Sequence, residues 1–199
     1  MNKLIITAFE PFGIIPTNSS LEVLKALSDE FQKIVLPVSY EKCEDIIKKI
    51  LLEQQPDYLL LLGQAQNRRT IALEQIAINY INTPTRDNDG KFYLNHLIKA
   101  DGNHGYFNTI HADKIVEELA LNHPIHLSYS AGVYVCNYTF YLALYYINKY
   151  HLPTKVGFIH YPLYLNQMEG ESSIIELSTM INTTNQIIQL LFEKKESSY

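Results

Sequence analysis

Cysteine is scarce in this sequence. Its 199 residues include only Cys43 and Cys136, which lie far apart and form neither a CxxC pair nor a spacing typical of metal ligands. A disulfide framework and a cysteine-based metal site are therefore not expected. Unpaired thiols are typical of a reducing compartment, so we expect a cytoplasmic protein.

Long apolar runs are also missing. The apolar run in the N-terminal segment "MNKLIITAFEPFG" holds about six residues, whereas a signal sequence needs roughly 7–15 and a membrane span about 20. We interpret this segment as the first buried strand and expect no membrane partner. A large excess of charge is equally absent, and the formal net charge of −5 argues against a nucleic-acid partner.

The remaining composition is that of an ordinary globular protein. Hydrophobic residues make up 47% of the chain and charged residues 19%, which are usual proportions for a soluble domain. The sequence shows no internal repeat and no low-complexity linker. We therefore expect a single domain over residues 1–199.

Predicted strands and helices alternate along nearly the whole chain. Short apolar runs predict strands, and apolar residues at helical spacing predict helices. The expected strands are 3–9, 33–38, 57–63, 70–81, 125–130 and 155–162, and the expected helices are 18–31, 41–54, 111–123, 135–150 and 172–195.

This alternation is typical of an α/β fold. We expect a three-layer open sandwich, in which a mostly parallel twisted sheet carries helices on both faces. Ligands of such sheets bind at the carboxyl ends of the strands. The loops that follow Ala8, Gly63, Ser130 and Ile159 are therefore the candidate site.

Cys136 admits two interpretations. It shares one helical stripe with Phe140, Ala143, Leu144 and Ile147, which favours a small buried residue with a structural role. Its position favours a nucleophile instead, because the small residues before it predict a turn that places the thiol in the first turn of a helix. Free N–H groups and the helix dipole stabilise a thiolate or an oxyanion there.

Two further residues would complete such a site. His160 ends a predicted strand at the expected sheet edge and can act as a base. Glu74 interrupts the alternating run "TIALEQIAIN", where a buried carboxylate is costly unless it is paired. Each residue taken alone also fits a structural role.

Five segments taken together resemble the pyroglutamyl peptidase I family, also called pyrrolidone carboxyl peptidase, a group of cytosolic cysteine peptidases. They are "TAFEPFG" (7–13), "GQAQNR" (63–68), "LEQIAIN" (73–79), "SAGVYVCN" (130–137) and "GFIHYP" (157–162). The resemblance covers nearly the whole domain. It implies an open α/β sandwich and an omega-peptidase that removes N-terminal pyroglutamate (5-oxoproline) from peptides, with no metal and no cofactor.

The resemblance also implies catalytic roles. Cys136 would be the nucleophile, His160 the general base and acid, and Glu74 the group that orients the imidazole. Thiolate attack would form a thioacyl-enzyme intermediate, which water then hydrolyses. Family members are often dimers or tetramers, so a homodimer or homotetramer is expected.

Other residues that match the motifs are expected to bind the pyroglutamyl ring. Phe9 and Phe12 can sandwich the flat lactam, although ordinary packing also explains them, and Val135 can complete the apolar wall. Asn18 and Gln64 can pair with the lactam or hold the loops around it. Such a pocket would reject a free N-terminal glutamate or glutamine, whose charged amine would lose its hydration without gaining a partner.

Two loops depart from the family pattern. Gln66 and Asn67 stand where a double glycine is usual, before the matching Arg68, and Pro84 stands where an arginine is usual. Arg86 lies two residues further on and is the candidate to replace that arginine. Arg68 and Arg86 are therefore included among the expected substrate-binding residues.

These departures leave two alternatives open. One is a cysteine amidase of the same fold with an altered acyl specificity. The other is a weakly active relative that binds blocked N-termini, which would gain support if residues 66–90 covered Cys136.

Overall fold

The computed structural model describes residues 3–13, 15–168 and 175–196. Six strands form the main sheet in the order β2-β1-β3-β10-β4-β9. These strands are β1 (Leu4–Phe9), β2 (Gln32–Leu36), β3 (Tyr58–Gln64), β4 (Ile71–Glu74), β9 (Ile125–Ser128) and β10 (Lys155–Tyr161). The helices are α1 (Ser19–Ala26), α2 (Tyr40–Lys49), the short π-helix η1 (Ile50–Gln54), α3 (Ala112–Leu119), α4 (Val135–Lys149) and α5 (Leu177–Glu196).

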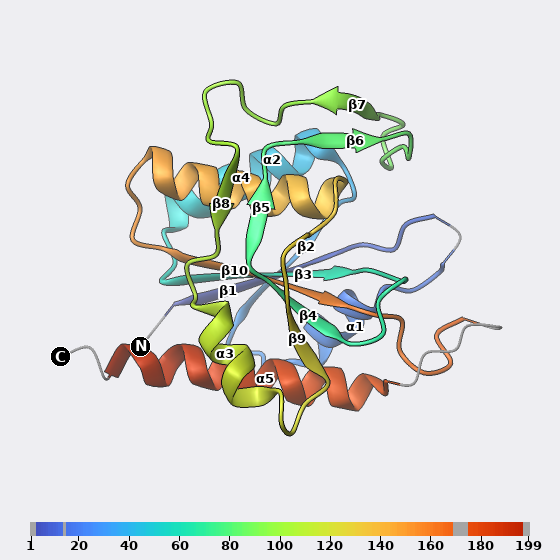
Figure 1. Ribbon diagram of the computed structural model, residues 1–199, viewed down its shortest axis with the longest axis vertical. Helices are drawn as coiled ribbons and strands as arrows, with labels where there is room; N and C mark the ends of the chain where they lie inside the picture. The colour runs from blue at the N-terminus through green and yellow to red at the C-terminus, as the bar shows by residue number, and fades with distance from the viewer. Residues whose placement is uncertain (1–2, 14, 169–174, 197–199) are drawn as a thin grey trace.

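Helices cover both faces of this sheet, as Figure 1 shows. Successive strand residues point to opposite faces, so Leu59 and Leu61 of β3 pack in the layer of α2 and α4. Leu60 and Leu62 pack on the other face, with α1, α3 and α5. Because both faces are covered, β3 is a continuous apolar run rather than an alternating one. The predicted three-layer α/β architecture is confirmed.

Strand direction matches the prediction for most of the sheet. β1, β2, β3 and β10 run parallel to one another, while β4 is antiparallel to β10 and parallel to β9. The carboxyl ends of β1, β3 and β10 therefore lie at one edge. The loops that follow these three strands meet there.

The single strand predicted over 70–81 is wrong. The segment forms β4, β5 (Ile76–Ile78) and β6 (Ile81–Thr83), and the last two pair with β8 (Gly105–Phe107) and β7 (Tyr93–His96) outside the main sheet. The side-chain amide of Asn137 on α4 bonds to the backbone of Ile78 and Tyr80 and holds this excursion against the helix. Apolar alternation continues across the breaks, so the pattern alone does not reveal where the chain leaves the sheet.

Four predicted helices have clearly different bounds. The helix expected over 111–123 forms only over Ala112–Leu119. The helix expected over 18–31 ends at Ala26, and the one expected over 41–54 changes to a π-helix after Lys49. The helix expected from residue 172 begins at Leu177, and residues 172–174 lie outside the described residues.

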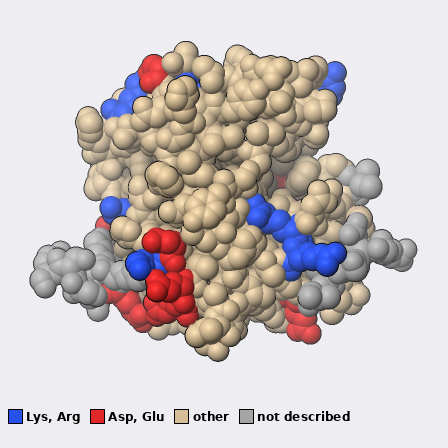
Figure 2. Space-filling model, viewed as in Figure 1, with Lys and Arg blue, Asp and Glu red and all other residues tan. Residues whose placement is uncertain are grey.

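Charge is sparse on the face of the molecule shown in Figure 2, most of which is neither acidic nor basic. Among the described residues, no helix is both long and apolar enough to cross a bilayer.

Candidate active site

Cys136 lies in the first turn of α4, as predicted. Gly132 has φ of +80°, a left-handed conformation that favours glycine, in the loop that leads from β9 to the helix. The helix then begins at Val135, and its N-cap residue Tyr134 makes no side-chain capping bond. The N–H groups of the first turn therefore stay available for an anionic ligand beside the thiol.

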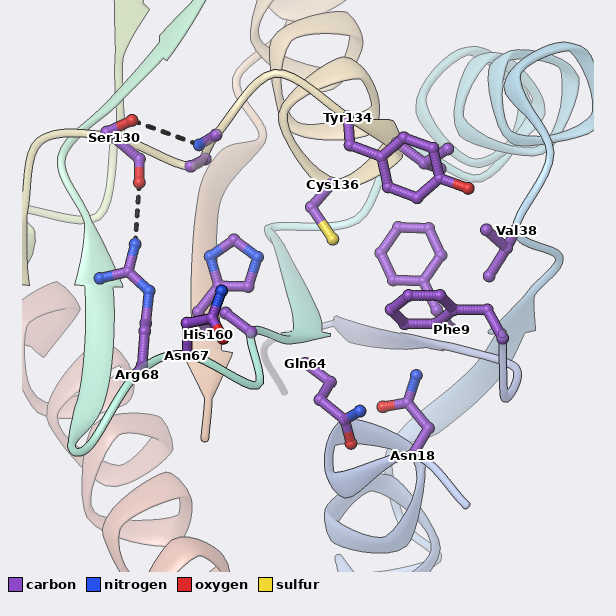
Figure 3. Close-up of a pocket in the computed structure, with 15 residues that line it drawn as sticks. Phe9, Asn18, Val38, Gln64, Asn67, Arg68, Ser130, Tyr134, Cys136 and His160 are labelled. Carbon is purple, nitrogen blue, oxygen red and sulfur yellow. Dashed lines mark hydrogen bonds between the residues drawn. The ribbon is translucent and has the colours of Figure 1, made fainter. Parts of the chain in front are cut away.

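His160 and Glu74 form a buried pair next to Cys136. His160 Nδ1 lies 2.7 Å from Glu74 Oε1, and the two side chains are 4% and 0% exposed. Since a carboxylate only accepts hydrogen bonds, Nδ1 carries the proton and Nε2 is left as the free basic nitrogen. The Cys136 sulfur and the His160 ring point into the same cavity in Figure 3. The structure thus brings the three predicted catalytic residues together.

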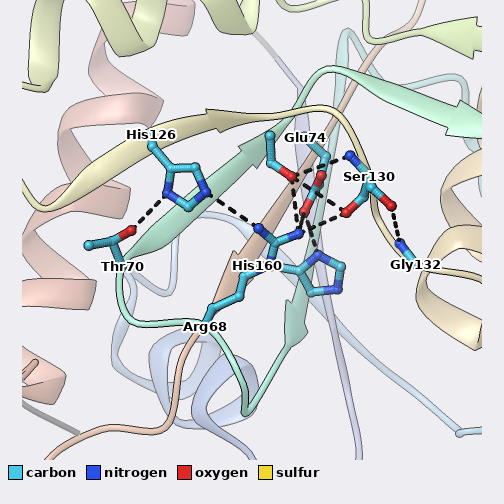
Figure 4. A network of polar contacts seen from close by, with 8 residues as sticks. Arg68, Thr70, Glu74, His126, Ser130, Gly132 and His160 are labelled. Atoms are coloured by element: carbon cyan, nitrogen blue, oxygen red, sulfur yellow. Dashed lines mark hydrogen bonds and ion pairs between the residues drawn. The ribbon is translucent and has the colours of Figure 1, made fainter.

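Arg68 balances the charge of the buried carboxylate. Its Nη2 donates to Glu74 Oε1 at 2.7 Å and to the Ser130 carbonyl at 2.8 Å (Figure 4). It also donates to Ser128 Oγ at 3.0 Å. Arg68 also lines the cavity. Its guanidinium is nevertheless committed to the carboxylate and the loop behind it.

The Cys136 thiol is a weak acid in this environment. Burial raises its pKa to about 12, Cys43 and Glu74 act in the same direction, and Arg68 and the backbone N–H of Cys136 oppose them. The position of Cys136 at a helix N-terminus had suggested a stabilised thiolate. The raised pKa shows instead that the helix terminus alone does not ionise the thiol. A nucleophilic thiol at this place would need a base, and His160 Nε2 is the basic nitrogen that lines the same cavity.

A cavity of about 300 Å³ opens beside the thiol. Besides Cys136 and His160, its lining includes six of the seven substrate-binding residues predicted from the sequence, namely Phe9, Phe12, Asn18, Gln64, Arg68 and Val135. Asn67 lies on the wall, but Cys136 remains partly exposed, so the segment 66–90 does not seal the thiol. The volume falls at the lower end of the range for small-molecule sites.

Gln64 and Asn18 differ in what they can offer a ligand. Gln64 Oε1 accepts from the Ser19 N–H and from Gln167 Nε2, both at 2.7 Å, which fixes the amide and directs Nε2 elsewhere. Asn18 uses both ends of its amide, because Oδ1 accepts from Ser20 and Nδ2 donates to the Glu10 carbonyl. Gln64 therefore keeps a donor for a ligand, whereas Asn18 caps α1 and holds the loop of Phe9 and Phe12.

Arg86 is not brought to the cavity, which corrects its expected place in the site. Its guanidinium donates to the Gly90 carbonyl at 2.6 Å and lies 4.7 Å from the Phe92 ring centroid. The tight turn around Asp87, whose carboxylate accepts from Lys91 N, keeps this loop folded on itself. Arg86 contacts the site through its backbone alone, because its carbonyl accepts a hydrogen bond of 2.8 Å from the hydroxyl of the wall residue Tyr134.

Two of the larger side chains of the wall, Val38 and Tyr134, were not predicted from the sequence. Val38 follows β2, whose carboxyl end lies at the same edge as β1, so the topology would have indicated it. Tyr134 lies in the motif segment 130–137, but it is one of seven tyrosines between residues 129 and 150, and nothing in the sequence singled it out as a wall residue. Among the described residues, no group of three or more His, Cys, Asp or Glu side chains is arranged to hold a metal ion.

A sheet edge that brings a cysteine, a histidine and a buried carboxylate to one cavity is the arrangement of a thiol hydrolase. The sequence model of the pyroglutamyl peptidase family matches residues 2–190. The chain belongs to the pyroglutamyl peptidase family, and the resemblance inferred from its motifs is confirmed.

Individual relatives agree in sequence and in fold. A pyrrolidone-carboxylate peptidase of Fusobacterium nucleatum is 36% identical over 184 residues, which cover 89% of this chain and 86% of the relative. Pyrrolidone-carboxylate peptidase 2 of Caldanaerobacter subterraneus is 38% identical, with 98% of this chain and 99% of the relative covered. The solved pyrrolidone carboxyl peptidase of Thermococcus litoralis matches with a TM-score of 0.93 at 29% identity, covering 100% of this chain and 97% of that chain.

Proposed function

We propose that this protein removes the N-terminal pyroglutamyl residue from peptides, with Cys136 as nucleophile, His160 as general base and acid, and Glu74 as the group that orients the imidazole. The observation that carries the assignment is the 2.7 Å bond between His160 and Glu74 beside the cavity that Cys136 lines. Membership of the family supports the substrate class.

The first half-reaction forms a thioacyl-enzyme. His160 Nε2 takes the thiol proton, and the sulfur of Cys136 bonds to the pyroglutamyl carbonyl carbon. The resulting oxyanion faces the free N–H groups at the start of α4. The C–N bond then breaks, and the imidazolium returns its proton to the leaving amine.

The second half-reaction restores the thiol. His160 removes a proton from water as the hydroxyl oxygen bonds to the thioacyl carbon. The C–S bond breaks, 5-oxoproline leaves, and the proton returns to the Cys136 sulfur. Glu74 stabilises the imidazolium that forms in both halves, because its carboxylate already accepts the Nδ1 proton.

The cavity wall supplies the recognition of the lactam. The flat ring packs against Phe9, Phe12 and Val135, and Nε2 of Gln64 donates to the ring carbonyl. This donor is directed by the two bonds that hold Gln64 Oε1 in place. Among the described residues that line the cavity there is no carboxylate, so a charged amine would be desolvated there without a counter-charge.

One assay tests the activity and the nucleophile together. The protein is incubated, folded and reduced, with a pyroglutamyl amide that releases a fluorogenic amine, and Cys136→Ser is compared with Cys43→Ser. Cys43 is fully buried in the core away from the cavity lining, so it is the matched control. Absence of turnover by the wild type would refute the activity, and wild-type turnover by Cys136→Ser would refute the nucleophile.

An altered acyl specificity is the second candidate, because the side chain of Asn67 lies on the cavity wall. A panel of prolyl, glutaminyl and acetylated amides separates it from the first candidate. Faster cleavage of any of these than of the pyroglutamyl amide would favour the second.

We also propose that residues 1–199 act as one catalytic domain in the cytoplasm and assemble as a homodimer or homotetramer. The support is the family resemblance and the need to keep a catalytic thiol reduced. Light scattering on the purified chain measures the assembly, and a monomeric mass at assay concentration would contradict it.

A further inference from the structure

His126 lies outside the cavity lining and contacts the arginine that serves the catalytic pair. It is a partly exposed residue of β9. Its Nε2 lies 3.4 Å from Arg68 Nη1, and its Nδ1 lies 2.8 Å from Thr70 Oγ1, as Figure 4 shows. Since a guanidinium only donates, Nε2 must be the unprotonated nitrogen, and Nδ1 carries the proton toward Thr70.

These contacts complete a continuous chain of four side chains. His126 meets Arg68 Nη1, while Arg68 Nη2 meets Glu74 Oε1, and the same oxygen meets His160 Nδ1. Arg68 thus uses one terminal nitrogen for His126 and the other for Glu74, and Glu74 Oε1 accepts from both Arg68 and His160. The orientation of Glu74, and through it the imidazole, therefore depends on where the guanidinium is held.

We propose that His126 is a pH-dependent positioning residue, which holds Arg68 against Glu74 while its ring is neutral and releases that hold when its ring is protonated. A protonated ring has no acceptor at Nε2. It also places a second positive charge beside the guanidinium at a contact of 3.4 Å, where like charges repel.

The surroundings of the ring keep it neutral near neutral pH. Burial lowers the pKa of His126 below its usual value of 6.5, the Arg68 guanidinium lowers it further, and Glu74 and the Ile71 backbone act in the opposite direction. Arg68 and Glu74 are the charged groups that face it from the loop before β4 and from β4 itself. The ring is partly exposed, so solvent protons reach it without unfolding.

The consequence is a second protonation in the acidic limb of the activity profile. Protonation of the catalytic imidazole alone makes log(kcat/KM) fall by about one per pH unit. If protonated His126 also disables the site, the limb steepens toward about two per pH unit. This inference rests on the proposed roles of Glu74 and His160.

The test compares His126→Gln with His126→Lys across the pH profile of pyroglutamyl amide cleavage. Glutamine can still accept from Arg68 and does not titrate, so His126→Gln should show a limb of about one per pH unit. Lysine mimics the protonated ring, so His126→Lys should lose about tenfold in kcat even near pH 8. Wild-type steepness in His126→Gln, or wild-type kcat in His126→Lys, would overturn the inference.

Other readouts separate the inference from misfolding and from failure of the proposed function. Circular dichroism at each pH shows whether a variant is folded. NMR titration of the His126 ring in the wild type gives the pH at which this ring is half protonated, and the acidic limb of the activity profile should steepen near that pH. A wild-type limb of about one per pH unit would overturn the inference without any variant. Absence of wild-type turnover at every pH would instead refute the proposed function.

Discussion

Replacing Arg68 by methionine should be among the most destabilising single changes at the site. Methionine keeps much of the apolar stem of the side chain but removes the guanidinium. Glu74 would then be a fully buried carboxylate that has lost its cation, because its side chain is 0% exposed and that of Arg68 is only 22% exposed. Glu74 Oε2 has no hydrogen-bond partner among the described residues. Oε1 would keep only the bond from His160 Nδ1, so no second cation would replace the guanidinium.

The expected magnitude follows from this burial. Breaking a buried ion pair by removing one partner costs about 3–5 kcal/mol, because the other charge is left uncompensated. Arg68→Met/Glu74→Gln, which removes both charges, should recover most of that loss and retain a cost of about 1 kcal/mol for the missing hydrogen bonds. The single change therefore threatens a large share of a total stability of about 5–15 kcal/mol.

Urea unfolding of the wild type, Arg68→Met and Arg68→Met/Glu74→Gln measures these differences in the free energy of unfolding. The same measurement at several pH values tests the direction of the effect. Acidification neutralises the lone carboxylate of Arg68→Met, so its stability deficit should narrow from about pH 8 to about pH 5. The deficit of the double variant should change little over that range, because its amide does not titrate.

A surface pair provides the control. Lys25 lies 2.8 Å from Glu22 on α1, and its side chain is 61% exposed, so Lys25→Met should cost under about 1 kcal/mol. The reasoning would be refuted if Arg68→Met cost no more than this control, or if adding Glu74→Gln deepened the loss.

The remaining predictions concern the cavity and its loops. Gln64→Leu should lower kcat/KM by about 10- to 100-fold, mainly through KM, since it removes a donor to the bound lactam; a fall in kcat alone would contradict that role. Asp87→Ala removes the acceptor of the Tyr40, Asp89 and Lys91 N–H groups, so the free energy of unfolding in urea should fall by about 2–3 kcal/mol. An unchanged unfolding midpoint would show that the Asp87 carboxylate does not stabilise this loop. Because burial raises the pKa of Cys136 to about 12, its alkylation by iodoacetamide should accelerate by about tenfold per pH unit above neutrality, and a plateau near pH 8 in mass spectra would instead indicate a preformed thiolate.

Patterns of neighbouring residues were sufficient for much of the fold. The apolar run of β3 indicated a strand covered on both faces, and the stripe through Cys136 indicated a buried helix. Both predictions were correct because the spacing of apolar residues, which shows the buried face of an element, can be read from a short stretch of chain. The cysteine, histidine and glutamate proposed as catalytic were found through their motifs, and each lies near the end or the start of an element.

Other parts of the site depended on contacts between distant segments. The alternation over 70–81 could not show that β4 ends at Glu74, because the same period continues into β5 and β6. Arg86 matched the expected arginine by proximity in sequence, yet its own turn directs it to Gly90. A residue's nearest neighbours along the chain do not specify which way its loop folds.

The amino-acid order thus determined most strands of the main sheet, most of the helices, the faces that they bury and the side chains proposed to carry the chemistry. Tertiary packing decided that Arg68 pairs with the buried Glu74 and that His126, from another strand, reaches Arg68. These contacts join residues up to 58 positions apart, and they arise from strand order and direction. Strand order and direction are set by the packing of the whole sheet against its helices, which no local period encodes.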